Sequence, residues 1–192
     1  MKQTLIPALL LGLIAQSASA SSIYNESIDG DLSGVFSAPD LLPITTGVNT
    51  LIGTTGANGG TGATDGSDAD YFTITIPAGK ELTTITLDSY VANPAITSQS
   101  FIGYVNAAAF TGQGGGDIDD NELFGTADLG NPNLINAITG QSSLGPGDHS
   151  FWIQEIATTV IDYQFSVTVV PEPVSAGLGL LGLAIVAGRR RR

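Results

Sequence analysis

Four oxygen-bearing side chains in the second half of the chain have the spacing of a calcium-binding loop. They occupy positions 1, 3, 5 and 12 of the EF-hand pattern, where oxygen ligands are needed: Asp117, Asp119, Asn121 and Asp128. Glu122 stands at position 6, where that pattern has glycine, and no helical periodicity flanks the segment. Ca²⁺ also accepts oxygens at other angles, so a different calcium geometry on a β-loop stays open. The alternative is a solvated acidic loop.

A second acidic cluster precedes an aromatic segment. Asp65, Asp68 and Asp70 could supply calcium ligands at the edge of a strand, or they could be solvated. Residues 21–170 hold seventeen acidic side chains and one basic one, Lys80, so salt bridges cannot neutralise them. Self-repulsion then opposes the compact state. A divalent ion would relieve it, and could also bridge to an anionic polysaccharide.

Catalytic patterns are weak. His149 is flanked by Asp148 and Ser150, but neighbouring residues on a strand face opposite ways, which does not suit a catalytic triad. We expect a strand-edge histidine. No G-x-S-x-G motif or cysteine is present, and no spacing nominates one carboxylate pair for glycoside hydrolysis. A non-enzymatic protein is therefore expected, with a secreted hydrolase the most distant alternative.

Aromatic side chains could in principle form a platform on which sugars stack. The candidates are Tyr71, Phe72, Phe151 and Trp152. Ordinary packing within or between strands is the favoured interpretation.

Composition excludes further classes. The 192 residues include only six Lys and Arg, and four of these close the chain, so nucleic acid is not an expected partner. The absence of cysteine excludes a disulfide scaffold and a thiolate metal site.

Residues 1–20 have the pattern of a secretory signal peptide. Lys2 is followed by an apolar run from Leu5 to Ala15, and Ala18 and Ala20 provide the small residues that signal peptidase accepts. We expect export through the Sec machinery, with the mature chain starting near Ser21.

Residues 171–192 combine three ordered elements. Pro171, Glu172 and Pro173 are expected to break the preceding strand and expose its backbone. A fifteen-residue apolar stretch, 174–188, follows, and a basic end then favours the cytoplasmic side: Arg189, Arg190, Arg191 and Arg192. This arrangement closely resembles the PEP-CTERM sorting signal of Gram-negative bacteria. The resemblance implies a transmembrane sorting helix that rests transiently in the inner membrane, recognition by an exosortase, and removal of the tail near the motif.

Between these segments, residues 21–170 predict β-structure. Apolar and polar residues alternate over 70–76, 81–87, 150–156 and 163–169, with turns at 77–80 and 144–148. The alternation places Phe165, Val167 and Val169 in a core, with Ser166 and Thr168 outside. Residues 53–68 are expected to be a loop, and no segment has a sustained helical period. The predicted fold is all-β, a single β-sandwich or jelly-roll-like domain.

The segment from Gly66 to Gly79, with an acidic turn, an aromatic-led strand and a Pro-Ala-Gly turn, resembles the bacterial pre-peptidase C-terminal domain. Leu144 to Gly147 before Phe151-Trp152-Ile153 is similar to the turn and strand near that domain's end. The resemblance implies an accessory β-sandwich, usually non-catalytic, that sometimes binds calcium or polymer.

These observations together predict an exported cell-surface or extracellular-matrix protein associated with exopolysaccharide. The alternative is a calcium-dependent module that binds carbohydrate or protein through the 117–128 loop.

Overall fold

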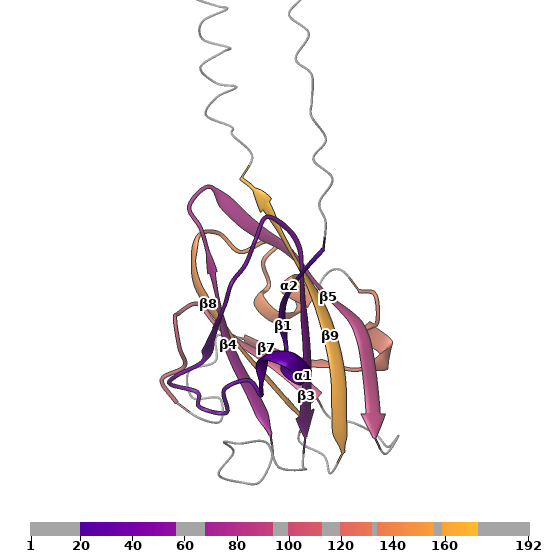
Figure 1. Ribbon diagram of the computed structural model, residues 1–192. Coiled ribbons are helices and arrows are strands. Elements are labelled where there is room, and N and C mark those ends of the chain that lie inside the picture. The colour runs from indigo at the N-terminus through magenta and orange to yellow at the C-terminus, as the bar shows by residue number, and fades with distance from the viewer. Residues whose placement is uncertain are drawn as a thin grey trace, which may run out of the picture.

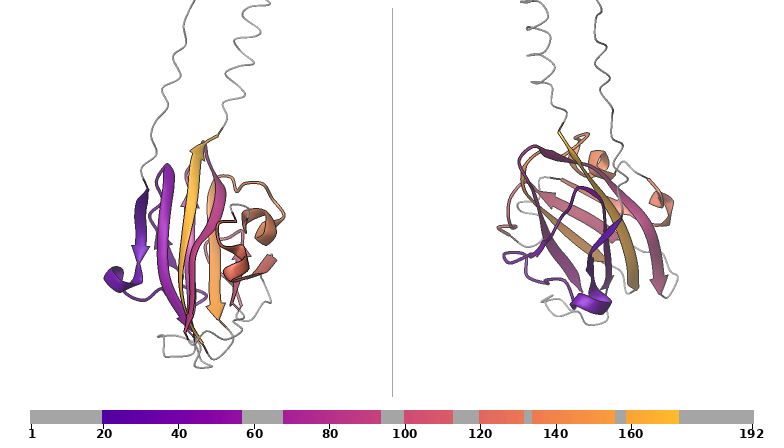
Figure 2. Two further views of the ribbon diagram at one scale, coloured as in Figure 1. Left: turned by 90° about the vertical axis from the view of Figure 1, so that its right-hand side faces the viewer. Right: turned by 45° about the horizontal axis from the view of Figure 1, so that its top comes forward.

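The computed structural model describes residues 20–56, 68–93, 100–112, 120–131, 134–155 and 159–172, with the backbone alone for 120–122. In this part of the chain, two β-sheets pack face to face, which confirms the predicted all-β class (Figures 1 and 2). The four-stranded sheet has the order β1 (Ser21–Asn25), β3 (Gly47–Gly56), β9 (Val160–Pro171), β5 (Lys80–Asn93). The five-stranded sheet has the order β2 (Asp40–Leu42), β4 (Ala69–Ile76), β8 (Gly147–Glu155), β6 (Ser100–Val105), β7 (Asp120–Phe124).

Most neighbouring strands are antiparallel, but one edge of each sheet is parallel. β1 runs parallel to β3, and β2 runs parallel to β4. The connection from β1 to β2 contains the short helix α1 (Glu26–Asp29). Because β1 and β3 run in the same direction, α1 lies beside the carboxyl end of β3 (Figure 1).

The main core lies between the sheets and follows the predicted alternation. Phe72, Ile74 and Ile76 of β4 are all buried. Phe72 stacks on Phe151 of β8, with ring centroids 5.4 Å apart. Such a pair stabilises the fold beyond the contribution of the area that each ring removes from water.

The core side of β9 is also as predicted. Its buried members in this stretch are Phe165, Val167 and Val169. Ser166 and Thr168 alternate with them and are only partly buried. Period-two patterning therefore located both inner faces correctly.

A smaller aromatic cluster covers the other face of the five-stranded sheet. Tyr71 and Trp152 stack there at 5.3 Å, and Phe110 meets Tyr71 edge-on at 5.6 Å. All four residues considered for a sugar platform are buried, Trp152 being the most exposed at 7%. These rings therefore contribute packing and present no open stacking surface.

Two local expectations were wrong. Residues 53–56 belong to β3 rather than to a loop. Three short helical segments of the described residues were also missed: α1, the 3-10 turn η1 (Thr126–Asp128) and α2 (Leu134–Thr139). α2 has only six residues, too few to show a helical period, and it buries Leu134, Ile135 and Ile138.

Ser21 and Pro171 lie at the same end of the sandwich (Figures 1 and 2). β9 includes Pro171 rather than stopping before it. None of the helices in the described residues is long and apolar enough to cross a membrane. The predicted sorting helix, with Pro173 and Arg189 to Arg192, and most of the predicted signal peptide, including Ala18, lie outside the described residues; Ala20 is described and exposed.

Candidate metal centre

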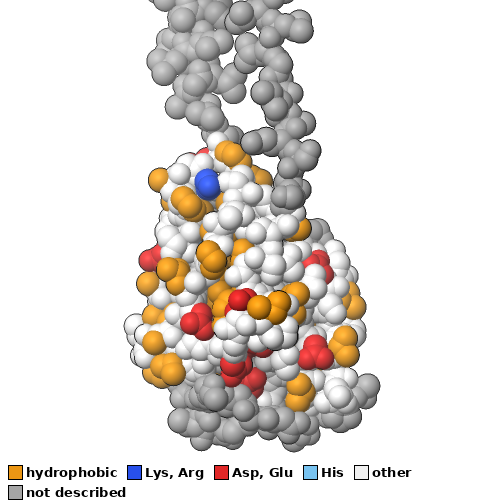
Figure 3. All heavy atoms as spheres, in the orientation of Figure 1, with side chains coloured by type: hydrophobic (Ala, Val, Ile, Leu, Met, Phe, Trp, Pro, Cys, Tyr) orange, Lys and Arg blue, Asp and Glu red, His pale blue; other side chains and the backbone are white. Residues whose placement is uncertain are grey.

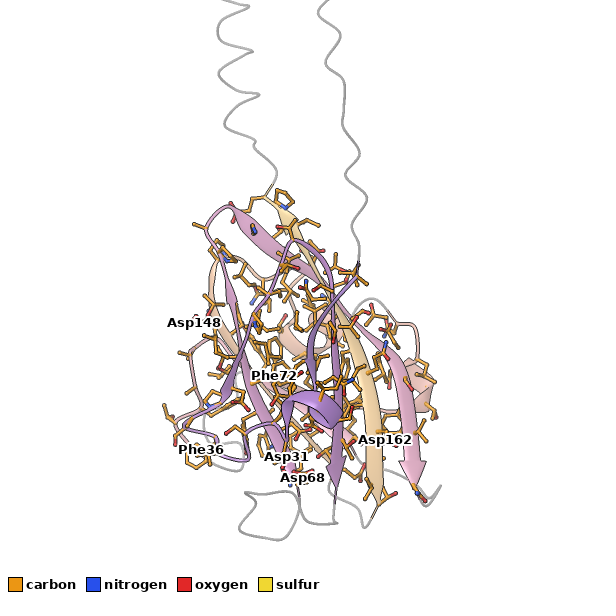
Figure 4. All side chains as sticks on the ribbon, in the orientation of Figure 1. Asp31, Phe36, Asp68, Phe72, Asp148 and Asp162 are labelled. Atoms are coloured by element: carbon orange, nitrogen blue, oxygen red, sulfur yellow. The ribbon has the colours of Figure 1, made fainter. Side chains whose placement is uncertain are left out.

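Three carboxylates converge at the end of the sandwich opposite Ser21 and Pro171. Glu26 opens α1, Asp31 follows that helix, and Asp70 is the second residue of β4. One carboxylate oxygen from each of the three residues lies within 4.8 Å of the others. Figure 4 shows Asp31 and Asp68 close together beside α1. We call Glu26, Asp31 and Asp70, with the neighbouring Asp68, the acidic cluster.

Local hydrogen bonds place Glu26 in this cluster. The Asn25 side chain accepts from the backbone N–H of Ser27 at 3.1 Å, and Asp29 Oδ2 accepts from the N–H of Asn25 at 2.8 Å. This reciprocal capping fixes the single turn of α1. Glu26 then accepts from two backbone N–H groups, that of Thr54 at 2.6 Å and that of Leu32 at 3.2 Å. Its side chain therefore links α1 to the end of β3.

Asp70 is the deepest member of the cluster and is fully buried. Its Oδ2 accepts a hydrogen bond from Tyr163 Oη at 2.7 Å. Its Oδ1 is buried and has no hydrogen-bond partner among the described residues. Buried polar atoms rarely lack a partner, because losing water without replacement costs free energy. Asp70 Oδ1 is therefore able to coordinate a cation or to accept a hydrogen bond.

A glycine makes the Tyr163–Asp70 contact possible. Gly53 of β3 lies directly opposite Tyr163 of β9. A Cβ at position 53 would lie 2.3 Å from Tyr163 Oη and 2.5 Å from its Cζ. Only glycine leaves room for the phenol ring in this position.

Asp68 forms the neighbouring wall of the site. Its backbone N–H donates to Gly56 O at 2.9 Å, and its carbonyl accepts from Thr55 Oγ1 at 2.8 Å. Asp68 is 8% exposed and Asp70 is fully buried, whereas Asp31 is exposed. The site is thus closed on the side of the sandwich and open to solvent at Asp31.

Burial and mutual repulsion raise the pKa values of these groups. Burial raises the pKa of Glu26 to about 7 and that of Asp68 to about 6, and the charge of Asp31 adds to both. Burial, and then the charge of Glu26, hold the pKa of Asp70 well above its usual range. Each pKa is raised because the charged form loses water and meets like charges.

No lysine or arginine of the described residues compensates these carboxylates. Lys80 is the only lysine or arginine in the described part of the chain, and it pairs with Pro171 near the opposite end. Figure 3 shows this basic group at the upper end and a group of acidic side chains toward the lower end. Protons or a cation must therefore offset the charge of the cluster.

The donor set indicates which cations the cluster could hold. All the candidate ligand atoms are carboxylate oxygens, which suit the hard ions Ca²⁺ and Mg²⁺. Ca²⁺ tolerates irregular arrangements of oxygen ligands, whereas Mg²⁺ demands near-octahedral geometry. A cluster drawn from a helix, a loop and a strand fits the more tolerant ion.

Two members of the second predicted cluster lie in this group of carboxylates. Asp68 and Asp70 are brought together with Glu26 and Asp31, while Asp65 lies outside the described residues. Sequence reasoning missed Glu26 and Asp31, which precede β4 by about forty residues. No local spacing links them, because the pairing of β1 with β3 brings them together.

The predicted 117–128 loop is only partly visible. Asp117 and Asp119 lie outside the described residues, and Asn121 lies in β7 with its backbone alone described. Asp128 lies in η1, where its carboxylate accepts from the N–H of Gly125 at 2.9 Å. Calcium binding by this loop stays a prediction.

His149 is buried within β8, between β4 and β6, and not at a strand edge as expected. Its Nε2 lies 2.9 Å from Gly145 O, so Nε2 carries the proton and donates, and Nδ1 accepts from Tyr104 Oη at 2.9 Å. Asp148 accepts from Thr75 at 2.6 Å. The imidazole is therefore engaged by groups other than the flanking Asp148 and Ser150.

No protein-family model matches the chain, and neither a curated protein nor a solved structure is significantly similar to it.

Proposed function

We propose that the protein is an exported, non-catalytic surface or matrix module whose sandwich binds Ca²⁺ through Glu26, Asp31 and Asp70. The observation that carries the calcium site is the carboxylate of Asp70. It is fully buried, one of its oxygens is held by Tyr163, and the other has no partner among the described residues. Two further carboxylates lie within 4.8 Å, so a cation here would offset three charges together.

The hydrogen bonds of the cluster suit ion binding. Glu26 and Asp70 are oriented by donors from β3 and β9, so their positions do not depend on the ion. Such orientation by surrounding groups is typical of metal ligands. The exposed Asp31 completes the group from the solvent side.

Export and sorting are supported by the extent of the folded domain. β1 begins at Ser21, directly after Ala20, and β9 ends at Pro171, the first residue of the predicted sorting motif. The sandwich therefore fills the interval between the two predicted signals. In this proposal the exosortase processes the chain, and the domain then resides in a matrix that contains exopolysaccharide. Replacing Glu172 should leave full-length protein in the inner membrane; normal surface delivery of that variant would contradict the sorting step.

The calcium site is tested by thermal unfolding of the purified chain in EDTA and in increasing Ca²⁺. Binding to the native state at about 100 times Kd adds roughly 2.7 kcal/mol, which raises Tm by about 5–10 °C for a domain of this size. Asp70→Asn should abolish the rise. Asp128→Asn should leave it intact, because Asp128 caps a separate turn.

The two variants distinguish the two calcium hypotheses. Loss of the rise in Asp128→Asn alone would assign the ion to the 117–128 loop. A native chain with no rise beyond a salt control of equal ionic strength would contradict calcium binding altogether.

A further inference from the structure

The carboxyl end of β9 is bonded into the sheet beyond the last residue of the strand. Pro171 pairs with Lys80 of β5, and the backbone N–H of Glu172 donates to Gly79 O at 2.9 Å. Two residues earlier, Val169 is fully buried and pairs with both β3 and β5. The sandwich therefore extends two residues into the predicted sorting motif.

The turn that accepts this bond has a fixed shape. It joins β4 to β5, and the N–H of Lys80 donates to Pro77 O across it at 3.2 Å. Gly79 has φ of 75°, a conformation that glycine adopts readily and other residues rarely do. A Cβ there would have no atom within 4 Å, so the need for glycine is conformational and not steric. The turn thus holds the Gly79 carbonyl beside the end of β9.

Pro171 is compatible with its place in the sheet. Proline has no N–H, so it is tolerated in a strand only where no ladder bond is lost. β3 makes its last pairing with β9 between Gly47 and Val169, so it does not reach Pro171. The next N–H, that of Glu172, is the one that bonds to Gly79.

This pairing limits which part of the backbone a processing enzyme can bind. Enzymes that cut peptides commonly bind the chain as an extended strand, through its backbone groups on both sides of the bond that breaks. From Val160 to Val169 the strand pairs with both β3 and β5, and from Val170 to Glu172 it stays paired with β5 and the β4–β5 turn. Binding them in an enzyme would require β9 to leave β5 and would expose Val169.

We infer that the β4–β5 turn positions the sorting motif, and that the peptide bond broken in processing lies on the carboxyl side of Glu172. The inference rests on the processing step of the proposed function. In that step the C–N bond breaks and the carbonyl carbon bonds to a nucleophile, either water or an acceptor amine. The released nitrogen takes up the proton that the nucleophile loses. The mature protein keeps Pro171 and Glu172 in the sheet.

The first test is the C-terminus of the mature protein, read by mass spectrometry from cells that process the chain. The expected terminal peptide contains both Pro171 and Glu172. A mature chain ending at Pro171 or earlier would overturn the inference while leaving processing intact. A chain found only with its tail attached would overturn the processing step and the inference with it.

A variant tests the role of the turn. Gly79→Val strains the turn, and Gly140→Val is a matched control, since Gly140 has φ of 65° and equally open surroundings. In the purified full chain, hydrogen exchange at the Glu172 amide should be at least about tenfold faster in Gly79→Val and unchanged in the control. Cells carrying Gly79→Val should then yield additional mature ends at or before Pro171. Faster exchange with an unchanged cut position would exclude a positioning role for the turn.

Discussion

Tyr163 Oη donates a 2.7 Å hydrogen bond to Asp70 Oδ2, joining β9 of the four-stranded sheet to β4 of the five-stranded sheet. Both residues are buried, and both are inner-strand residues of their sheets. Burial, and then the negative charge of Asp70, raise the pKa of Tyr163 well above its usual range, so the phenol stays protonated and remains a donor. The bond therefore serves the packing of the sheets and the orientation of the proposed ligand together.

Tyr163→Phe should weaken both the packing of the two sheets and the orientation of Asp70. Removing the hydroxyl leaves Asp70 Oδ2 without this donor and should lower the free energy of unfolding in EDTA by about 1–3 kcal/mol. It should also change the rise in Tm that Ca²⁺ produces. Tyr90→Phe is the control, because its hydroxyl contacts Ser100 in a different part of the interior. A calcium response that is equal in the two variants would contradict a role for Tyr163 at the site.

Gly53→Ala should destabilise the domain by displacing the Tyr163 ring, whose Oη would lie 2.3 Å from the new Cβ. Overpacking of this kind costs about 1–3 kcal/mol in urea unfolding. Gly145→Ala should cost no more than about 0.5 kcal/mol, since a Cβ at that position meets no atom within 4 Å. The double variant Gly53→Ala/Tyr163→Ala should lose less free energy of unfolding than the sum of the losses in the two single variants. Simple additivity would show that the ring and the glycine are not coupled.

Stability without calcium should fall as pH rises through the acidic and neutral range. The folded pKa of Glu26, about 7, exceeds its ordinary value of 4.5, and that of Asp68, about 6, exceeds 3.8. The folded state therefore binds more protons than the unfolded state over this window, so this stabilisation is complete below the unfolded pKa values and is lost as pH rises through the folded ones. Urea unfolding in EDTA between about pH 4 and pH 8 measures the slope.

Glu26→Gln is the control for that slope, because it removes one of the titrating groups. The variant should show a less negative dependence of stability on pH than the native chain. With Ca²⁺ the effect of pH reverses, since the ion needs deprotonated carboxylates and binds more tightly as pH rises. An identical pH dependence in native chain and variant would contradict the assignment to Glu26.

Adjacent residues of β4 should differ sharply in their contribution to stability. Ile74 is 1% exposed in the core, and Ile74→Ala should cost about 2–5 kcal/mol by chemical denaturation. Thr75 is exposed and its side chain bonds to the half-buried Asp148, so Thr75→Ala should cost less than about 1 kcal/mol. Similar costs at the two positions would contradict the register of this strand.

Period-two patterning predicted the strands whose inner faces carry large apolar side chains, such as Phe72 and Phe165. It could not predict the last part of β3, from Gly53 onward. Gly53 belongs to the strand because it pairs with Tyr163, which lies more than a hundred positions later in the chain. The same limit applies to the site. The spacing of Asp68 and Asp70 marked one wall, but Glu26 reaches them through the parallel pairing of β1 with β3, which no local pattern encodes.

The arrangement of β9 has a mechanical consequence. β9 ends at Pro171, and the acidic cluster lies at the other end of the sandwich (Figures 1 and 4). A force applied at the acidic cluster and resisted at Pro171 would be directed along β9. The hydrogen bonds from β9 to β3 and β5 lie perpendicular to the strand. Such a load stretches these bonds together in shear instead of opening them one after another. We therefore expect the domain to resist unfolding by tension along its length.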